Sequence, residues 1–159
     1  MVQNGLKGIF DSIEMLSRAK LQAESRVKLI KTMREDEEIT ASDNRRMTTL
    51  YDEARAHVNS GIDRLLVELE TTGKVDDDKS FEEIASRAAQ QVEAFVTESD
   101  QLVFGEDRSG MVEAGLGLAG ILVGAMVNVW KNLRGARKVR HSKLVKRIDD
   151  LRWPAFDEL

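Results

Sequence analysis

The chain has 159 residues, of which 42% are hydrophobic and 33% charged, with one Pro, no Cys and a net charge of −4. A chain of this length accommodates one domain with a substantial buried core. The absence of Cys excludes disulfides, thiol catalysis and Cys-based zinc sites. Scarce Pro and abundant Ala, Leu, Glu, Lys and Arg indicate a chain that is almost entirely helical.

Two of the predicted helices show an amphipathic spacing of three and four. The first spans residues 5–37 and carries its apolar stripe on one face. The other spans residues 81–101, and it follows a capping box in which Ser80 is the N-cap and Glu83 stands three residues later. The stripe of the first helix contains Ile9, Ile13, Leu16, Ala23, Val27 and Ile30.

A further amphipathic helix is predicted between these two, over residues 44–71. Ser42 or Asp43 can serve as its N-cap. Gly61 interrupts its middle, which indicates a bend or a close neighbour.

The fourth predicted helix starts near Ser109 and runs unbroken to residue 151, where Trp153 and Pro154 end it. Its first part, residues 111–130, carries one charge, Glu113, and is long enough to cross the hydrocarbon core of a bilayer. The same pattern also fits a helix buried in protein. These two interpretations stay open on the sequence alone.

Small residues recur every three or four positions along this apolar helix and share one face. An interior Gly costs about 1 kcal/mol relative to Ala, so a helix that tolerates several is usually packed closely against another helix. We expect this face to mediate helix packing in a membrane, in the core or at a subunit interface. Its residues are Gly110, Ala114, Gly117, Gly120, Gly124 and Asn128.

A basic run without any acidic residue follows at 131–147. It fits a solvated helix end, a contact with anionic lipid, or pairing with the acidic helices of a neighbour, because residues 1–104 carry a net charge of −7 and residues 131–159 carry +5. Nucleic acid is disfavoured, since no aromatic residues interleave the run. The candidate contact residues are Lys131, Arg134, Arg137, Lys138, Arg140, Lys143, Lys146 and Arg147.

No motif predicts catalysis, a cofactor or a metal. Residues 115–120 read G-x-G-x-x-G, but no strand precedes them as a dinucleotide site requires. Residues 76–78 are three Asp without the ligand spacing of a calcium loop. His57 follows Glu53 by four residues, yet the chain has no pair of Glu-x-x-His motifs for a di-metal bundle.

We therefore predict an all-α, four-helix bundle-like fold in one domain overall, with an amphipathic three-helix region at 1–104 and a Gly-rich apolar helix with a basic extension at 105–159. The expected function is non-enzymatic: self-association as a homo-oligomer, together with membrane association through helix 111–130 and its basic flank 131–147. The alternative is a soluble oligomerisation or adaptor bundle with helix 111–130 in the core or at a subunit interface. We expect a cytoplasmic location, at the membrane periphery or inserted in it if that helix meets lipid.

Amphipathic helices that flank one Gly-rich apolar helix also form the plan of colicin-type pore domains, and the layout of this chain is similar to that plan. The resemblance covers the layout and no specific motif. It implies a third function, a pore-forming effector that releases helix 111–130 on a trigger.

Overall fold

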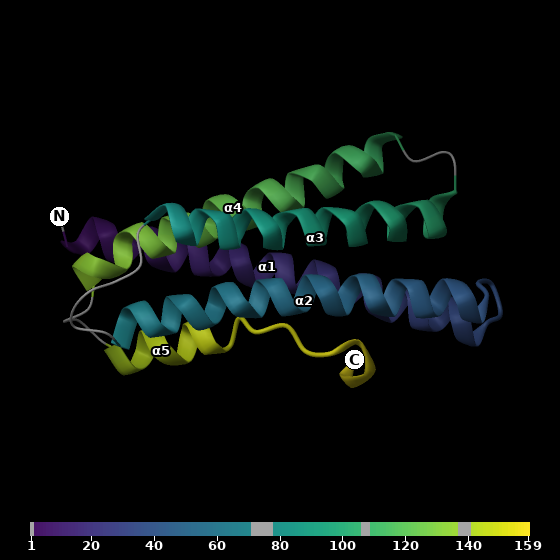
Figure 1. Ribbon diagram of the computed structural model, residues 1–159, viewed down its shortest axis with the longest axis horizontal. Coiled ribbons are helices and arrows are strands. Elements are labelled where there is room, and N and C mark those ends of the chain that lie inside the picture. The colour runs from purple at the N-terminus through teal and green to yellow at the C-terminus, as the bar shows by residue number, and fades with distance from the viewer. Residues whose placement is uncertain (1, 71–77, 106–108, 137–140) are drawn as a thin grey trace.

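The chain forms an all-α bundle, as the sequence predicts. The computed structural model describes residues 2–70, 78–105, 109–136 and 141–159, and the side chains of 7–70, 79–105, 117–133 and 143–159. Within these residues there are helices and no strand (Figure 1). The helices are α1 (Val2–Glu35), α2 (Ala41–Glu70), α3 (Asp78–Phe104), α4 (Ser109–Ala136) and α5 (His141–Asp149), followed by a short 3₁₀ turn, η1 (Phe156–Glu158).

The core lies between α1, α2, α3 and one face of α4. The entire apolar stripe predicted for the first helix is buried, and the same holds for Tyr51 and Ile62 of α2 and for Phe81 and Phe95 of α3. The Phe81 ring stacks on Trp130 of α4, with 4.4 Å between the ring centroids. Apolar stripes at helical spacing therefore determine which face of each helix turns inward.

α1 ends in a Schellman turn centred on an acidic residue. The backbone N–H of Glu38 donates to the carbonyl of Met33 at 2.8 Å, and that of Glu37 donates to Arg34 at 3.2 Å. Glu37 has a φ of 58°, a left-handed conformation that Gly usually supplies at this position.

The start of α2 differs from the prediction by a few residues. The backbone N–H of Asp43 donates to Thr40 Oγ1 at 3.0 Å, while the N–H of Thr40 donates to Asp43 Oδ2 at 3.2 Å. This reciprocal pair is a capping box, so Thr40 is the N-cap rather than Ser42 or Asp43. α3 likewise begins at Asp78, so Ser80 lies inside the helix and is not its cap.

The predicted continuous helix from Ser109 to residue 151 is wrong. α4 ends at Ala136, and α5 begins at His141 and packs against α2. Leu144 and Ile148 of α5 are buried there. Had the helix continued straight, residues 137–151 would extend about 22 Å further along the α4 axis, at 1.5 Å per residue, and could not reach α2.

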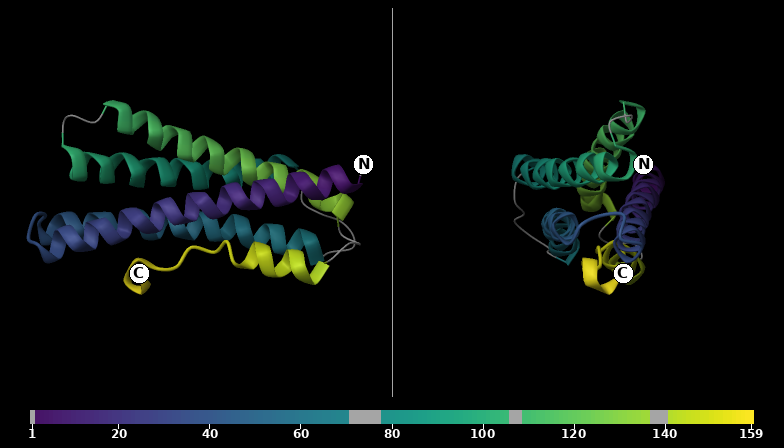
Figure 2. Two further views of the ribbon diagram at one scale, coloured as in Figure 1. Left: turned by 180° about the vertical axis from the view of Figure 1, so that it is seen from behind. Right: turned by 90° about the vertical axis from the view of Figure 1, so that its right-hand side faces the viewer.

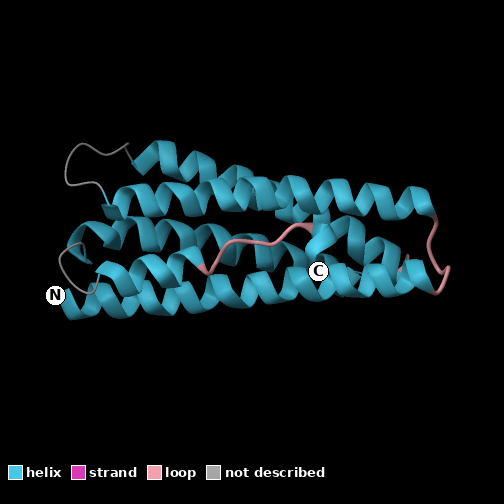
Figure 3. Cartoon of the chain, turned by 90° about the horizontal axis from the view of Figure 1, so that it is seen from below, coloured by secondary structure: helices cyan, strands magenta, loops and turns pink. Residues whose placement is uncertain are grey.

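The residues after α5 form an extended tail that lies between α1 and α2 (Figure 3). Leu151, Trp153 and Phe156 of the tail are buried. The sequence predicts that Trp153 and Pro154 end the helix, and α5 does end before them, at Asp149. It does not predict that this segment completes the core over α1 and α2.

Candidate interaction surface

α4 has one buried face and one open face. The buried face includes Leu122, Met126 and Val129, none of which exposes more than 1% of its surface. On the other side, Gly117, Gly120 and Gly124 are exposed. A Cβ built on any of these three glycines meets no atom of the described residues within 4 Å, apart from its own helix backbone.

Within the described residues, the glycines of the small-residue face therefore do not pack against another helix of the chain. The close packing that the sequence predicts is not made by Gly117, Gly120 or Gly124 with any other described part of the molecule. The physical reason is the direction of α4, whose first half tilts away from α1. Gly110 and Ala114 of the same predicted face lie outside the residues whose side chains are described.

Asn128 is the exception, because it lies at the point where this face of α4 contacts α1. Its Nδ2 donates to Ser12 Oγ at 2.7 Å and to the carbonyl of Gly8 at 3.3 Å, both on α1. Gly124 and Gly117 precede Asn128 by 4 and 11 residues, so they continue its row along the helix. Helices α1 and α4 thus meet at Asn128 and diverge toward Gly117, with α3 visible between them (Figure 2).

Most of the exposed large apolar side chains belong to α1, α4 and the end of α3. Among the described residues, six large hydrophobic side chains are at least 43% exposed, and five of them belong to α1, α4 or the last residue of α3. The sixth, Val67, is on α2. We call the five, with the three glycines of α4, the open face: Met15, Leu21, Leu29, Phe104, Ile121, Gly117, Gly120 and Gly124.

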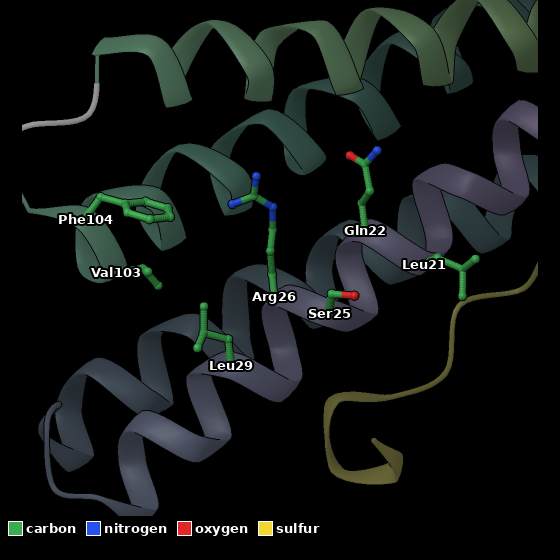
Figure 4. A pocket seen from close by; sticks show the side chains of 7 residues that line it. All are labelled: Leu21, Gln22, Ser25, Arg26, Leu29, Val103 and Phe104. Carbon is green, nitrogen blue, oxygen red and sulfur yellow. The ribbon is translucent and has the colours of Figure 1, made fainter.

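A pocket of about 430 Å³ lies at the α1–α3 side of the open face. Leu29 and Arg26 of α1 face Val103 and Phe104 of α3 across it, and Leu21 stands at its edge (Figure 4). The walls are mostly apolar, so the pocket favours an aliphatic or aromatic side chain over a charged ligand.

The charge at the base of this pocket is neutralised within the chain. The Arg26 guanidinium pairs with Oδ1 of Asp100, a residue of α3 that is fully buried. Asp100 Oδ2 has no hydrogen-bond partner. The pair ties α1 to α3 beneath the open face, and it leaves no net charge there to attract an anion.

The basic residues predicted to contact an anionic surface lie elsewhere. Lys131 is exposed, and its Nζ lies 3.8 Å from Oε1 of Glu82 on α3. Lys143, Lys146 and Arg147 are exposed on α5, on the opposite side of the bundle from the start of α4 (Figures 1 and 2). Arg134, Arg137, Lys138 and Arg140 lie outside the residues whose side chains are described. Of the described basic residues, those on α5 therefore do not share a face with the exposed glycines of α4.

The structure also bears on a metal site and on a membrane span. Across the described residues, no group of three or more His, Cys, Asp and Glu side chains is placed to hold a metal ion. His57 is half-buried on α2, and the side chains of residues 76–78 are not described. In the same part of the chain, no helix is both long and apolar enough to span a bilayer.

Comparisons of the chain with protein-family models, with curated proteins and with solved structures find no match. A functional hypothesis therefore rests on the geometry of the open face and on the sequence.

Sequence reasoning identifies the glycines of the open face but not its large side chains. On α1 the sequence does contain a signal for them. Met15, Leu21 and Leu29 lie outside the apolar stripe that begins with Ile9, Ile13 and Leu16, so they cannot face the same core. Phe104 carries no such signal, because its exposure depends on where α3 ends.

Proposed function

We propose that the protein is a non-enzymatic helical bundle that acts by self-association, and that a second copy covers the open face. The observation that carries this proposal is the concentration of exposed large apolar side chains on α1, α4 and the end of α3. Large exposed apolar patches on folded domains mark interaction sites, whereas single exposed apolar residues do not.

The charge pattern of α1 favours a second copy as the partner. Glu14, Leu21 and Lys28 are all exposed and are spaced by seven residues, so they lie on one side of the helix. In an antiparallel two-fold pairing with Leu21 at the axis, Glu14 of each copy stands opposite Lys28 of the other. A two-fold interface repeats every contact, so this register forms two ion pairs around an apolar centre.

The glycines of α4 add a second argument. Each of the three exposed glycines lowers helix stability by about 1 kcal/mol relative to Ala, and in the described part of the chain no neighbouring atom stands where its Cβ would be. A partner helix that approaches the α4 backbone closely accounts for them. We therefore expect Gly117→Leu or Gly124→Leu to weaken self-association while the isolated chain still folds.

The proposal is tested by exchanging the charges on α1. Sedimentation velocity of the wild type is expected to show a dimer that forms with rising concentration. Glu14→Lys and Lys28→Glu are each expected to weaken the dimer, because each places like charges opposite one another. The double variant Glu14→Lys/Lys28→Glu restores opposite charges and is expected to restore the dimer.

The control is Glu53→Lys, which makes the same charge change at an exposed position of α2. It is expected to leave the dimer unchanged. A wild type that remains monomeric at all concentrations would contradict the proposal, as would a double variant no better than the single ones. Co-sedimentation of the monomer with anionic vesicles would instead assign the open face to a membrane surface.

A further inference from the structure

The C-terminal tail is held between α1 and α2 as a bound peptide is held. Its two aromatic side chains, Trp153 and Phe156, are buried against the same tyrosine. Trp153 stacks on Tyr51 with ring centroids 5.7 Å apart, and Phe156 forms a T-shaped pair with Tyr51, with centroids 6.1 Å apart. The Lys31 ammonium of α1 lies 5.2 Å from the Phe156 ring centroid, where a cation is attracted by the ring face.

Side chains of one row of α2 bind the backbone around Trp153. Asn59 makes two hydrogen bonds to that residue: its Oδ1 accepts from the Trp153 N–H at 2.8 Å, and its Nδ2 donates to the Trp153 carbonyl at 3.1 Å. Arg55 Nε donates to the same carbonyl at 2.9 Å. Asn59 and Arg55 are four residues apart, so both reach the tail from one face of the helix.

The same row of α2 side chains also binds the backbone of the tail after Trp153. Tyr51 donates its hydroxyl to the carbonyl of Pro154 at 2.7 Å, and Asp52 Oδ1 accepts from the Phe156 N–H at 3.1 Å. Pro154 has no N–H, so its place in the tail leaves no donor unsatisfied. Hydrogen bonds to the main chain of an extended segment, with pockets for alternate side chains, are the means by which proteins recognise peptides.

We propose that the groove between α1 and α2 is a recognition site for an extended Trp-Pro-x-Phe segment, which residues 153–156 fill in cis and the tail of a second copy fills in trans. A second copy is the partner because every copy carries both the groove and its ligand. The proposal rests on the proposed function of self-association, but it uses a surface separate from the open face. The cis tail acts at an effective concentration in the mM range, so trans binding becomes visible once the cis tail is weakened.

The first test uses the full chain with Trp153→Ala and a fluorescent peptide of residues 150–159. Fluorescence anisotropy is expected to show binding to this variant and at least roughly tenfold weaker binding to the wild type, whose own tail competes. A second substitution in the groove, Asn59→Leu, is expected to abolish the binding, and so is Trp153→Ala in the peptide. If Trp153→Ala prevents folding, Phe156→Ala, which keeps the Trp153 stack, takes its place with the same expected order.

The second test distinguishes a partner copy from a free peptide. One full-length variant carries Trp153→Ala, with an intact groove, and the other carries Asn59→Leu, with an intact tail. Both also carry Glu14→Lys, which removes the α1 contact of the proposed dimer. Native mass spectrometry is expected to show mixed pairs only when the two variants are combined.

The outcomes separate the two proposals. Mixed pairs in the Glu14→Lys background support the tail site even if the open face proves to be solvated. A folded Trp153→Ala chain that binds no peptide up to about 1 mM, the range in which the cis tail acts, overturns the recognition site. Peptide binding without mixed pairs overturns the assignment of the second copy as its source.

Discussion

The terminal methyl group of Met126 in α4 occupies the space beside Gly61 of α2 in which a side chain would otherwise stand. Both residues are buried, so a side chain at position 61 would require the flexible end of Met126 to move within the core. The close neighbour of Gly61 expected from the sequence is therefore found.

This contact is expected to reduce the stability that Gly61→Ala would otherwise gain. Ala gains about 1 kcal/mol of helix propensity over Gly, but the Met126 methyl group must move aside in a packed core, and overpacking costs about 1 kcal/mol or more. We therefore expect no net gain in the free energy of unfolding, measured by urea denaturation. In a Met126→Ala background the neighbour is gone, so Gly61→Ala is expected to give the full gain. Gly8→Ala on α1 is the control, because its Cβ would make only ordinary contacts with Asn128 and Asn132, and it is expected to stabilise. A loss at Gly8 would show that helix propensity does not decide the outcome at these sites.

Glu37→Gly is expected to stabilise the chain by about 1 kcal/mol. The left-handed backbone at Glu37 costs an L-residue roughly this amount, and Gly avoids it. Thermal and urea unfolding measure the gain. Glu38→Gly, at the neighbouring position, which has no positive φ, is the matched control and is expected to bring no gain.

Substitutions at Arg26 and Asp100 are expected to have strongly coupled effects on the free energy of unfolding. Arg26→Met leaves the Asp100 carboxylate buried without its cation, which typically costs about 3–5 kcal/mol. The double variant Arg26→Met/Asp100→Leu removes both charges and is expected to recover most of that loss. A double-mutant cycle by urea denaturation tests this, and a coupling below about 0.5 kcal/mol, the usual limit for independent sites, contradicts it.

Tyr51 is expected to destabilise the fold at high pH. Burial, with a smaller contribution from Glu24, raises the pKa of Tyr51 above its ordinary value near 10. The protonated form is thus favoured in the folded state, and its contribution to stability is complete below pH 10. This contribution falls as the pH rises past 10, because the Tyr in the unfolded chain ionises there while the Tyr in the folded chain does not. It is lost by the time the pH reaches the pKa of Tyr51 in the folded state.

The chain has one Tyr, so the absorbance of tyrosinate reports this residue alone. We expect it to emerge above pH 10 together with loss of helical circular dichroism. The free energy of unfolding of Tyr51→Phe should fall less steeply over the same range. Ionisation of Tyr51 near pH 10 in the folded protein would show that the ring is not shielded from water.

The sequence predicts the parts of this fold that depend on local periodicity. The buried stripes of α1, α2 and α3 follow from spacings of three and four. This periodicity alone shows which face of each helix turns toward the core. The stop after α5 follows from Pro154 in the same local manner. These features require no knowledge of what each helix packs against.

The sequence does not predict features that depend on the direction of one helix relative to another. The glycines of α4 indicate close packing, but whether a neighbour is present depends on the divergence of α4 from α1. Periodicity likewise runs through residues 137–140, because Leu144 and Ile148 continue a helical stripe whether or not the chain turns. The packing of α5 against α2 decides that α5 does not continue along the axis of α4.

The tail also bears on how the molecule acquires its structure. Its hydrogen bonds to α1 and α2 join residues 94 to 130 positions apart, from Asn59–Trp153 to Lys20–Asp150. On the ribosome, α1 and α2 are made before Trp153, so the side of Tyr51 that the tail covers stays open until the tail is made, although Phe95 of α3 can already pack on the ring. Contacts of such long sequence separation form slowly, because closing a long loop costs entropy before the contact is gained. We therefore expect a nascent intermediate with an aromatic groove exposed to chaperones, which closes only when the tail arrives.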